Sequence, residues 1–575
     1  MKTKTIILVL LFAGIFSSGI SQNVAFSNKY HDPLLGENVF IFDPTMKMSD
    51  IQVIIDTLFN RQKGARSEFN NNRYALLFKP GHYDLDIQVG YYMQVAGLGK
   101  SPDDVVIKGA VRSNTTHHNS VLTNFWRSAE NLTVIPVKDT TDTWGVSQAA
   151  PMRRVHIKGN LHLFDKGYAS GGFLADSQID GVVSSGPQQQ WFSRNTGWEK
   201  WVGGNWNMMF MGVNHAPAGD WPEKPYTRIE TTPIVREKPY LTWENGEFCV
   251  RIPSLKRDSK GPDWIRGSND DRVIPLKNFY ITNAVTDNSS TINSALIKGM
   301  NILITPGIYK LDKCLLITHP GTLVIGLGFP SLTPLTGHSV MRLFDADGIT
   351  VAGLILDAGA DKSENLLQVG ERGSFHTHAS DPTFLFDIFC RVGGPFLGTV
   401  TSCVEINSND VCIDHTWLWR ADHGHGVGWD LNRGANGLVV NGNNVTVYGL
   451  FNEHFQEYQT LWNGENGRVF FYQSEMPYDP PSADAWMHNG TYGYASYKVS
   501  DSVKTHEAWG LGIYNVFYKA PVIVDNAIET PPALEKDIHH IIIFWLNGNK
   551  ESVVKSIING KGGSISFSHR KSVIN

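Results

Sequence analysis

The chain has 575 residues and a formal net charge of −5, which predicts more than one hydrophobic core and provides no basic face for nucleic acid. Its 55 glycines and 16 tryptophans, with only 18% charged residues, favour a turn-rich β protein with aromatic surfaces of the kind that hold sugars. The cysteines are odd in number and contain no Cys-x-x-Cys pair, which argues against a disulfide scaffold and against a thiolate zinc site; they are Cys249, Cys314, Cys390, Cys403 and Cys412.

The first residues have the composition of a secretory signal peptide, which we assign to residues 1–22. Lys2 and Lys4 precede an apolar run from Ile6 to Phe16, and small residues such as Ser21 follow it. The run is too short to cross a bilayer, and no later stretch reaches the ~20 apolar residues of a membrane helix. We therefore predict a secreted protein, extracellular or periplasmic, with no membrane partner.

A pattern of a short helix, a Pro-Gly turn, a Tyr-centred strand and a Gly-Leu-Gly turn occurs twice, about 226 residues apart. In the first copy a capped amphipathic helix beginning at Ser49 precedes Ala75-Leu-Leu-Phe-Lys-Pro-Gly-His-Tyr and then Met93-Gln-Val-Ala-Gly-Leu-Gly. In the second copy a short helix near Ser290 precedes Asn301-Ile-Leu-Ile-Thr-Pro-Gly-Ile-Tyr and then Thr322-Leu-Val-Ile-Gly-Leu-Gly. Two copies so far apart indicate two domains of the same kind.

Each copy is followed by short apolar strands that recur about every 20–25 residues and are broken by Gly, Asn and Asp. This spacing fits the rungs of a parallel β-helix, and the helix before each half would cap the exposed end of its stack. The predicted fold is all-β, with two right-handed parallel β-helix domains at 23–216 and 273–522. Residues 217–272 form the predicted connection, and 523–575 a C-terminal tail. A β-sandwich array is the competing fold, but it predicts hairpins and no capping helices.

Glu453 and Glu475 are the strongest catalytic candidates. They are 22 residues apart, which is about one rung, so their side chains are expected to stack on neighbouring strands. Two carboxyls so close resist ionising together, so the pKa of one rises and that residue can act as an acid. On spacing alone, two solvated turn glutamates are the favoured interpretation.

Gln148 and Ser170 form a similar pair in the first half, also 22 residues apart. Amide and hydroxyl groups at matching rung positions can hold a water molecule by hydrogen bonds. Taken by itself, the pair is better interpreted as part of a polar ladder inside or along the β-helix. Aromatic and polar residues gather nearby, as sugar platforms or as a cover for the side of the domain: Trp191, Arg194, Asn195, Trp198, Trp201, Trp206 and Asn207.

His423 and His425 alternate along an Asp-His-Gly-His-Gly segment, so both rings could face one metal ion. No convincing further ligand accompanies them, and hydrogen bonding at a cleft wall is the more ordinary role. We predict no metal and no cofactor.

Together and in this order, these segments resemble glycoside hydrolase family 55, the double β-helix exo-β-1,3-glucanases. The resemblance is carried by Glu453-His-x-x-x-Tyr-Gln, Gln473-Ser-Glu-Met-Pro-Tyr, Trp417-Leu-Trp-Arg-Ala-Asp-His, Val146-Ser-Gln-Ala and Ser170-Gly-Gly-Phe-Leu-Ala-Asp. The chain departs from the family pattern around Gln188 to Trp206, in the long stretch from Ala216 to Arg272, and after Val522.

The resemblance implies that Glu475 is the general acid and that Glu453, Gln148 and Ser170 place the nucleophilic water, with inversion at the anomeric carbon. It implies a polysaccharide substrate, with β-1,3-glucan first. Further substrate contacts are expected from Trp191, Arg194, Asn195, Trp206, His423, Tyr458, Gln473 and Tyr478.

Two other functions remain open from the sequence. Val411-Cys-Ile-Asp-His resembles a strand of the pectate lyases, which would make the protein a polysaccharide lyase that uses Ca²⁺. The acidic net charge is unfavourable for a polyanionic substrate. A carbohydrate-binding protein without catalysis is the second alternative, because the fold alone does not determine the function. The sequence does not indicate the oligomeric state.

Overall fold

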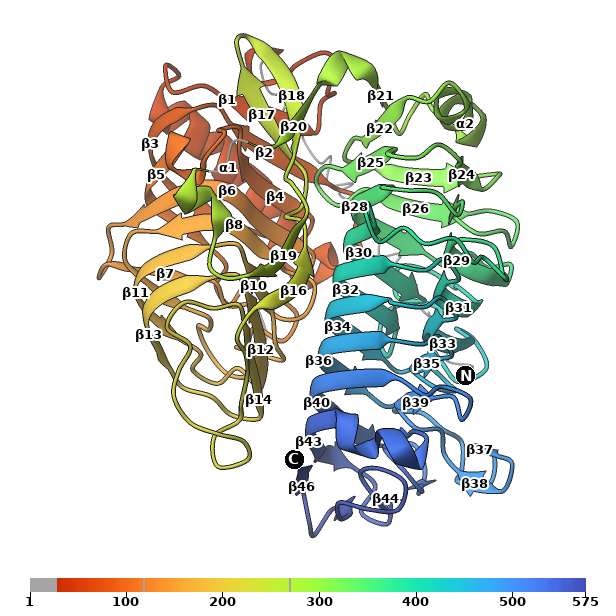
Figure 1. Ribbon diagram of the computed structural model, residues 1–575. Coiled ribbons are helices and arrows are strands. Elements are labelled where there is room, and N and C mark those ends of the chain that lie inside the picture. The colour runs from red at the N-terminus through yellow and green to blue at the C-terminus, as the bar shows by residue number, and fades with distance from the viewer. Residues whose placement is uncertain (1–27, 117–118, 268–269) are drawn as a thin grey trace, which may run out of the picture.

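The computed structural model describes residues 28–116, 119–267 and 270–575, which form two stacks of mostly parallel strands lying side by side (Figure 1). The fold predicted from the sequence, two parallel β-helix domains with few helices, is confirmed. The predicted signal peptide lies outside the described residues. Within those residues, no helix is both long and apolar enough to cross a membrane.

The first domain has an inner sheet that faces the second domain and an outer series of shorter strands (Figure 1). The inner strands are β1 (Val39–Phe42), β2 (Tyr74–Phe78), β4 (Met93–Gly97), β6 (Arg127–Pro136), β8 (Met152–Ile157), β10 (Phe173–Ala175), β12 (Gln190–Arg194), β14 (Asn207–Met211) and β15 (Tyr226–Ile229). The outer strands are β3 (Gly81–Gln88), β5 (Val105–Arg112), β7 (Thr141–Thr143), β9 (Asn160–His162), β11 (Gln178–Ser184) and β13 (Gly197–Val202).

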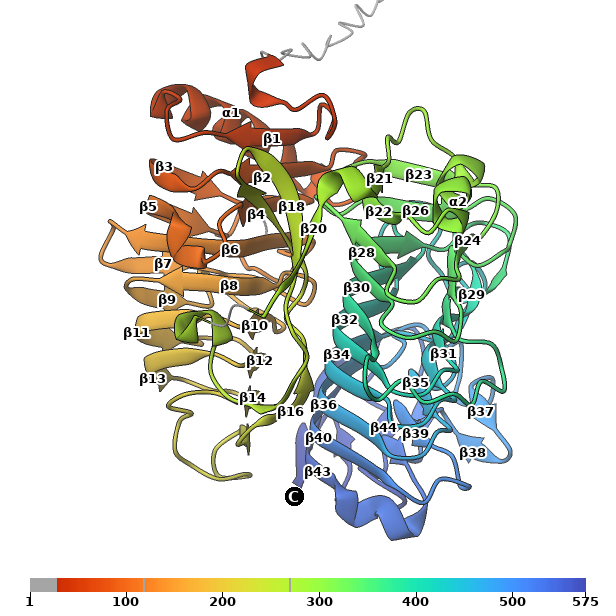
Figure 2. The same cartoon turned by 45° about the horizontal axis from the view of Figure 1, so that its top comes forward.

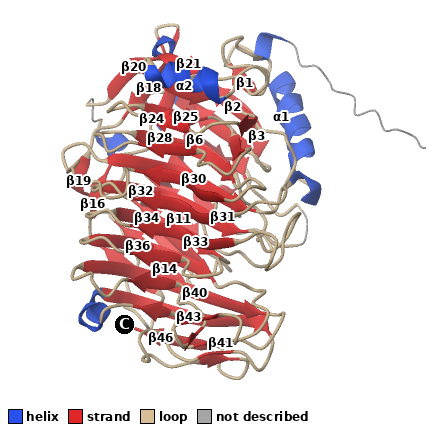
Figure 3. Cartoon of the chain, turned by 90° about the vertical axis from the view of Figure 1, so that its right-hand side faces the viewer, coloured by secondary structure: helices blue, strands red, loops and turns tan. Residues whose placement is uncertain are grey.

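The second domain has the same plan with longer inner strands, and Figure 3 shows its rungs stacked along one axis. The inner strands are β21 (Phe279–Ile281), β22 (Asn301–Ile304), β25 (Leu323–Gly326), β28 (Thr350–Asp357), β30 (Thr383–Val392), β32 (Val411–Arg420), β34 (Thr446–Glu453), β36 (Gly467–Glu475), β40 (His506–Phe517), β43 (Ile538–Gly548) and β46 (Lys571–Ile574). The outer strands are β24 (Leu315–Ile317), β27 (Met341–Leu343), β29 (Ser363–Val369), β31 (Val400–Ile406), β33 (Gly434–Val440), β35 (Thr460–Trp462), β39 (Tyr497–Val499) and β42 (Ile528–Glu529).

A helix stands at the start of each domain, as predicted (Figure 2). α1 (Met48–Gln62) buries an apolar face in the first core, and α2 (Ser289–Ile297) does so in the second. The predicted cap at Ser49 is wrong: the N-cap of α1 is Lys47, which makes no side-chain cap, so burial of the apolar face holds this helix. α2 is capped by the side chain of Asn288.

The segment between the domains contains more regular structure than the sequence analysis expected. β15 continues the first inner sheet, while β17 (Tyr240–Glu244) and β18 (Glu247–Ile252) form a hairpin that β20 (Arg272–Pro275) extends. Asn245-Gly246 is its two-residue turn, with both residues at positive φ. That dipeptide is a strong hairpin indicator, which the sequence analysis overlooked.

The stretch after Val522 is not a separate tail but continues the second domain. β43 pairs in parallel with β40, and β46 closes the sheet by pairing antiparallel with β43. Ile541, Ile543 and Trp545 alternate into the second core. This period of two is the pattern by which the strand could have been recognised.

The two inner sheets pack against each other through a cluster of aromatic side chains. Trp126 of the first domain contacts Trp417 and Trp419 of the second, with ring centroids 5.6 and 6.1 Å apart. Phe192 stacks on Phe471 at 5.6 Å. Much of the aromatic content thus joins the domains, where the sequence analysis expected surfaces for sugar.

Each long strand of the second inner sheet bends at one residue with positive φ, and these residues form a column across the sheet. The register aligns Gly353, Asp387, His415, Gly449, Phe471, Gly510 and His540. Glycine adopts this conformation at little cost, whereas other residues do so only when the surroundings hold them there. Asp387 and His415 are therefore direct neighbours at a bend in the sheet.

Candidate active site

Glu453 and Glu475 end two neighbouring strands of the second inner sheet. β34 and β36 pair in parallel, and the register places Glu453 directly opposite Glu475. Their residues are only 2% and 8% exposed. The structure therefore brings the two carboxyls together on successive rungs, where the sequence spacing predicted them.

The environment of Glu475 favours its protonated form. Burial raises the pKa of Glu475 well above its usual range, and the charge of Glu453 raises it further. Asp422 contributes in the same direction, whereas a hydrogen bond donated by Tyr478 lowers the pKa. The net result is a carboxyl that can carry a proton at the pH where ordinary glutamates are ionised.

The carboxyl of Glu453 is instead surrounded by donors. Gln148 Nε2 and Gln473 Nε2 donate to its Oε1 at 3.0 and 2.7 Å, and Trp417 Nε1 donates to its Oε2 at 2.7 Å. Burial raises the pKa of Glu453, but these three hydrogen bonds oppose that rise. The pKa of Glu453 is still raised, but that of Glu475 is raised well above its usual range, so Glu475 is the carboxyl of the pair that favours the protonated form.

The first domain contributes two polar side chains to the same site. Ser170 Oγ donates to Gln148 Oε1 at 3.0 Å, and Gln148 in turn donates to Glu453. Both residues lie in the turns that lead into β10 and β8. Gln148 has a φ of +35°, a conformation that its surroundings must enforce. The site is thus formed by both domains.

Two buried polar atoms around the glutamates have no hydrogen-bond partner among the described residues, namely Gln473 Oε1 and Tyr514 Oη. Tyr514 lies opposite Glu475 on β40. A water molecule or a ligand with hydroxyl groups can supply the missing hydrogen bonds of such atoms. Near Glu475, both atoms are therefore available to a polar ligand.

Four of the eight predicted substrate contacts lie in or beside this site. Tyr478 and Gln473 bond directly to the two glutamates. Trp206 lies 5.3 Å from the ring of Tyr514 and stacks on Phe544. His423 bonds to Asp422, whose charge acts on Glu475.

The predictions for Arg194 and Asn195 as substrate contacts are wrong. The Arg194 guanidinium is fully buried between Asp176 and Asp414, at 2.9 and 2.8 Å, and joins the two domains. The Asn195 side chain bonds to Ser259 in the connecting segment. Both lie at the far end of β12, where the connecting segment covers the sheet.

The prediction for Trp191 is also wrong, whereas that for Tyr458 stays a prediction. Trp191 is completely buried in the first core, so no sugar can reach its ring. Tyr458 lies beyond the end of β34 and packs on His488 and Tyr494, near β35 and the outer strands. Asp422 and Trp417 are site residues that the sequence analysis assigned no role. Both belong to the motif Trp417-Leu-Trp-Arg-Ala-Asp-His, whose resemblance to the family could have identified them as site residues.

His423 does not form a metal site with His425. Its two ring nitrogens bond to Asp422 at 2.9 Å and to Glu68 of the first domain at 2.6 Å. Burial would lower the pKa of His423, but these two carboxylates raise it to about 10. His423 is therefore a charged link between the domains at the edge of the site. No group of three His, Cys, Asp or Glu residues in the described ranges is arranged to hold a metal.

The strand that resembles a lyase segment is buried and forms no Ca²⁺ site. Asp414 bonds to Arg153 and Arg194, and His415 bonds to Asp387. The exposed fraction of Asp414 is 1% and that of His415 is 0%. These residues hold the interface between the domains instead.

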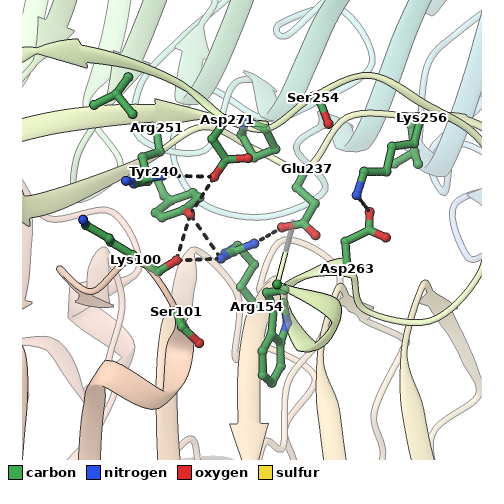
Figure 4. A pocket seen from close by; sticks show the side chains of 15 residues that line it. Lys100, Ser101, Arg154, Glu237, Tyr240, Arg251, Ser254, Lys256, Asp263 and Asp271 are labelled. Atoms are coloured by element: carbon green, nitrogen blue, oxygen red, sulfur yellow. Dashed lines mark hydrogen bonds and ion pairs between the residues drawn. The ribbon is translucent and has the colours of Figure 1, made fainter. Parts of the chain in front are cut away.

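A separate cavity of about 410 Å³ lies between the first domain and the connecting segment (Figure 4). Arg154 and Tyr240 line it, and their charged and polar groups bond to Glu237 and Asp271. The predicted site residues are not among its lining. Its charges are paired with one another, so it offers no reactive group for the chemistry at Glu475.

Comparison with known proteins agrees with this geometry. Residues 280–475 match the family model of the LAM55 pectate lyase-like domain. An exo-β-1,3-glucanase of Streptomyces sp. (strain SirexAA-E / ActE) is 44% identical over 533 residues, which cover 92% of this chain and 87% of the relative. The chain belongs to glycoside hydrolase family 55. The solved structure of sacteLam55A from Streptomyces sp. SirexAA-E is similar to this family member, with a TM-score of 0.90 and 42% identity over 94% of this chain and 98% of that one.

A second solved structure contains glucose. It is a variant of sacteLam55A in which one glutamate is replaced by alanine, and its TM-score and identity are the same, 0.90 and 42%. The two family members thus share the arrangement of both domains, and this chain is a glycoside hydrolase.

Proposed function

We propose that this glycoside hydrolase releases glucose from the ends of β-1,3-glucan by an inverting mechanism, at a site formed by both domains. The substrate and the exo mode are supported by the name of the 44% identical relative. The observation that carries the mechanism is the different environment of two adjacent carboxyls, Glu475 and Glu453, with Gln148 and Ser170 opposite them.

Glu475 supplies the acid in this proposal. Its carboxyl donates a proton to the glycosidic oxygen as the bond from that oxygen to the anomeric carbon breaks. The raised pKa of Glu475 keeps the proton available, and Tyr478 orients the carboxyl through its hydrogen bond. The leaving glucan therefore departs as a neutral alcohol.

Water is the nucleophile and approaches from the opposite face of the sugar. Glu453 Oε1 already accepts two hydrogen bonds and Oε2 accepts one, which leaves a lone pair on Oε2 for the water. Ser170 and Gln148 hold this water from the side of the first domain. As its oxygen bonds to the anomeric carbon, the water releases one proton to Glu453, and the glutamates then return to their starting states by exchange with solvent.

The spacing of the two glutamates is unusual for this mechanism. An inverting acid and base usually stand ~6.5–9.5 Å apart so that sugar and water fit between them, whereas these two occupy neighbouring strands. The donors on Glu453 weaken it as a base, so it orients the water more than it deprotonates it. Positioning of the water by Gln148 and Ser170 of the first domain then contributes more to the rate than its deprotonation does.

Digestion of a polysaccharide panel tests the proposed function. Laminarin should yield glucose from the first minutes, and a laminari-oligosaccharide labelled at its reducing end should shorten by one sugar at a time. Pectin, alginate and α-glucans should remain intact. Early release of mixed oligosaccharides would contradict the exo mode, and ultraviolet absorbance from an unsaturated product would identify a lyase.

We also propose that the enzyme is exported, on the basis of the lysines and apolar run between Lys2 and Phe16. Expression of the full chain in a bacterial host, followed by fractionation and N-terminal sequencing, should find the protein outside the cytoplasm with a new N-terminus near residue 23. A protein that stays in the cytoplasm with Met1 intact would contradict this.

A further inference from the structure

His415 lies at the centre of the contact between the two domains and touches the active site through the backbone. Its Nε2 is 3.1 Å from the carbonyl oxygen of Gln148, and its Nδ1 is 2.8 Å from Asp387 Oδ1. The ring stacks on Phe173 at 4.6 Å and 12°. These three contacts fix the position of the ring, and the contact with Gln148 joins it to a residue that we place beside the nucleophilic water.

Both ring nitrogens of His415 face acceptors. A backbone carbonyl oxygen can only accept a hydrogen bond, and an ionised carboxylate can only accept as well. Burial would raise the pKa of Asp387, but the charges of Arg153 and Lys238 and the hydrogen bond from His415 hold it well below its usual range. The ring of His415 is therefore held between an acceptor of the second domain, Asp387 Oδ1, and an acceptor of the first, the carbonyl oxygen of Gln148.

The backbone at these two residues is a second, independent observation. His415 and Asp387 have φ values of +69° and +50°, and they stand side by side in the column of bends across the sheet. The neighbouring positions, Gly353 and Gly449, are glycines, which adopt this conformation without strain. Side chains other than glycine keep this conformation only where their surroundings hold them there, as the contacts of Asp387 and His415 do here.

We propose that His415 is a positioning residue which, anchored by Asp387, fixes the Gln148 turn so that the Gln148 side chain stands between Ser170 and Glu453. The carbonyl of Gln148 accepts two donors, His415 Nε2 and the Ala150 amide at 2.9 Å. Together they hold the turn at its unfavourable φ. Loss of the imidazole lets this turn relax, and the amide that orients the water moves with it.

This inference rests on the proposed function, because it assigns His415 to the water side of that mechanism. A displacement of about 1 Å in a group that orients a reactant can lower the rate about 100-fold without preventing binding. The loss should therefore appear in kcat, while KM for laminari-oligosaccharides stays within about twofold. A residue that only supported folding would lower the melting temperature and leave kcat of the folded enzyme unchanged.

Two substitutions separate the two hydrogen bonds of the ring. His415→Gln places an amide near the position of Nε2 and can still donate to Gln148, whereas His415→Asn can reach only Asp387. Asparagine also tolerates positive φ, so the backbone bend survives in that variant. We expect kcat on laminarin to fall about 30- to 100-fold in His415→Asn and less than about tenfold in His415→Gln.

His378→Asn is the matched control. His378 is also buried, and its two ring nitrogens bond to Asp345 and Asp347 in the loops before β30 and β28. Its replacement should lower the melting temperature and leave kcat unchanged. Equal kcat in His415→Asn, His378→Asn and the parent enzyme would overturn the proposal.

An activated substrate tests the assignment to the water side. A 2,4-dinitrophenyl β-glucoside needs little protonation of its leaving group, so the defect of Glu475→Gln should shrink on it. The defect of His415→Asn should persist, because the water must still be placed. If the His415→Asn defect shrinks as much as that of Glu475→Gln, His415 acts on the acid side and the proposal fails. A parent enzyme inactive on both substrates would contradict the proposed function itself.

Discussion

Gln148 of the first domain donates a 3.0 Å hydrogen bond to Glu453 of the second, across 305 residues of sequence. That bond divides the site into two sides. Glu475 and Tyr478 belong to the second domain and form the acid side, while Gln148 and Ser170 bring the first domain to the water side. Neither domain contains the whole arrangement, so catalysis depends on how the two inner sheets are docked.

The first prediction concerns the acid. Glu475→Gln keeps the shape of the side chain but cannot donate the proton, so kcat on laminarin should fall by ~10²–10⁴. The defect should be smaller on an aryl glucoside with a good leaving group. Glu457→Gln is the control, since Glu457 is exposed at the turn beyond β34 and should keep full activity. Near-native activity of a folded Glu475→Gln variant would exclude Glu475 as the acid.

The second prediction concerns Asp422, whose charge raises the pKa of Glu475. Burial would raise the pKa of Asp422 itself, but its hydrogen bond with His423 lowers it to about 2, so it is charged throughout a normal assay range. Activity needs protonated Glu475 and is lost as the pH rises through the pKa of that residue. Asp422→Asn should lower this pKa and shift the alkaline limb of kcat against pH to lower pH. An unchanged limb, with the protein folded, would count against the coupling.

The third prediction has the opposite sign. Tyr478 donates a hydrogen bond to Glu475, which lowers the pKa of that carboxyl. Tyr478→Phe removes the hydroxyl, so the pKa should rise and the alkaline limb should move to higher pH. We also expect kcat to fall several-fold because the carboxyl loses its orientation. Measured beside Asp422→Asn in the same buffers, the two limbs should move apart, and movement in the same direction would refute this account of Glu475.

The sequence was sufficient to predict how the site residues pair. Rung length sets the spacing of 22 residues between Glu453 and Glu475 and between Gln148 and Ser170, so any parallel β-helix that includes both segments brings each pair together. The prediction that the two pairs lie close to each other was based on the resemblance to the family. The spacing of residues within one domain does not show which face of that domain packs against the other.

The sequence was not sufficient to predict which way the side chains of β12 point. Every residue of this strand is buried, because one face covers the core of the first domain and the other packs on the second domain. Alternation of polar and apolar residues therefore disappears, and nothing distinguishes Trp191, which points into the core, from Phe192, which points to the interface. If the alternation along β12 is assigned one residue out of step, Trp191 is placed on the face outside the core, where it does not lie.

The fourth prediction concerns docking of the domains away from the glutamates. Arg391 pairs with Asp357 through two hydrogen bonds of 2.6 and 2.9 Å and donates a third to Tyr92 of the first domain. Arg391→Met leaves Asp357 buried without its partner, which should cost about 3–5 kcal/mol of unfolding free energy. Calorimetry should show a lower melting temperature. Arg391→Met with Asp357→Leu should recover part of the loss, and a double variant no more stable than the single one would argue against the ion pair as the cause.

The last prediction concerns the stereochemistry of the product. Water held by Gln148, Ser170 and Glu453 reaches the anomeric carbon from the face opposite the departing glucan, so a β-1,3 linkage should give α-glucose first. Proton NMR in the first minutes of laminari-oligosaccharide hydrolysis should show the α-anomer ahead of mutarotation. A retaining enzyme would need Glu453 as a nucleophile that forms a covalent glycosyl intermediate. Three donors already surround the Glu453 carboxylate, which lowers its nucleophilicity. β-Glucose as the first product, or a glycosyl group trapped on Glu453 by a slow fluorosugar, would exclude inversion and with it the role of Gln148 and Ser170 in placing the water.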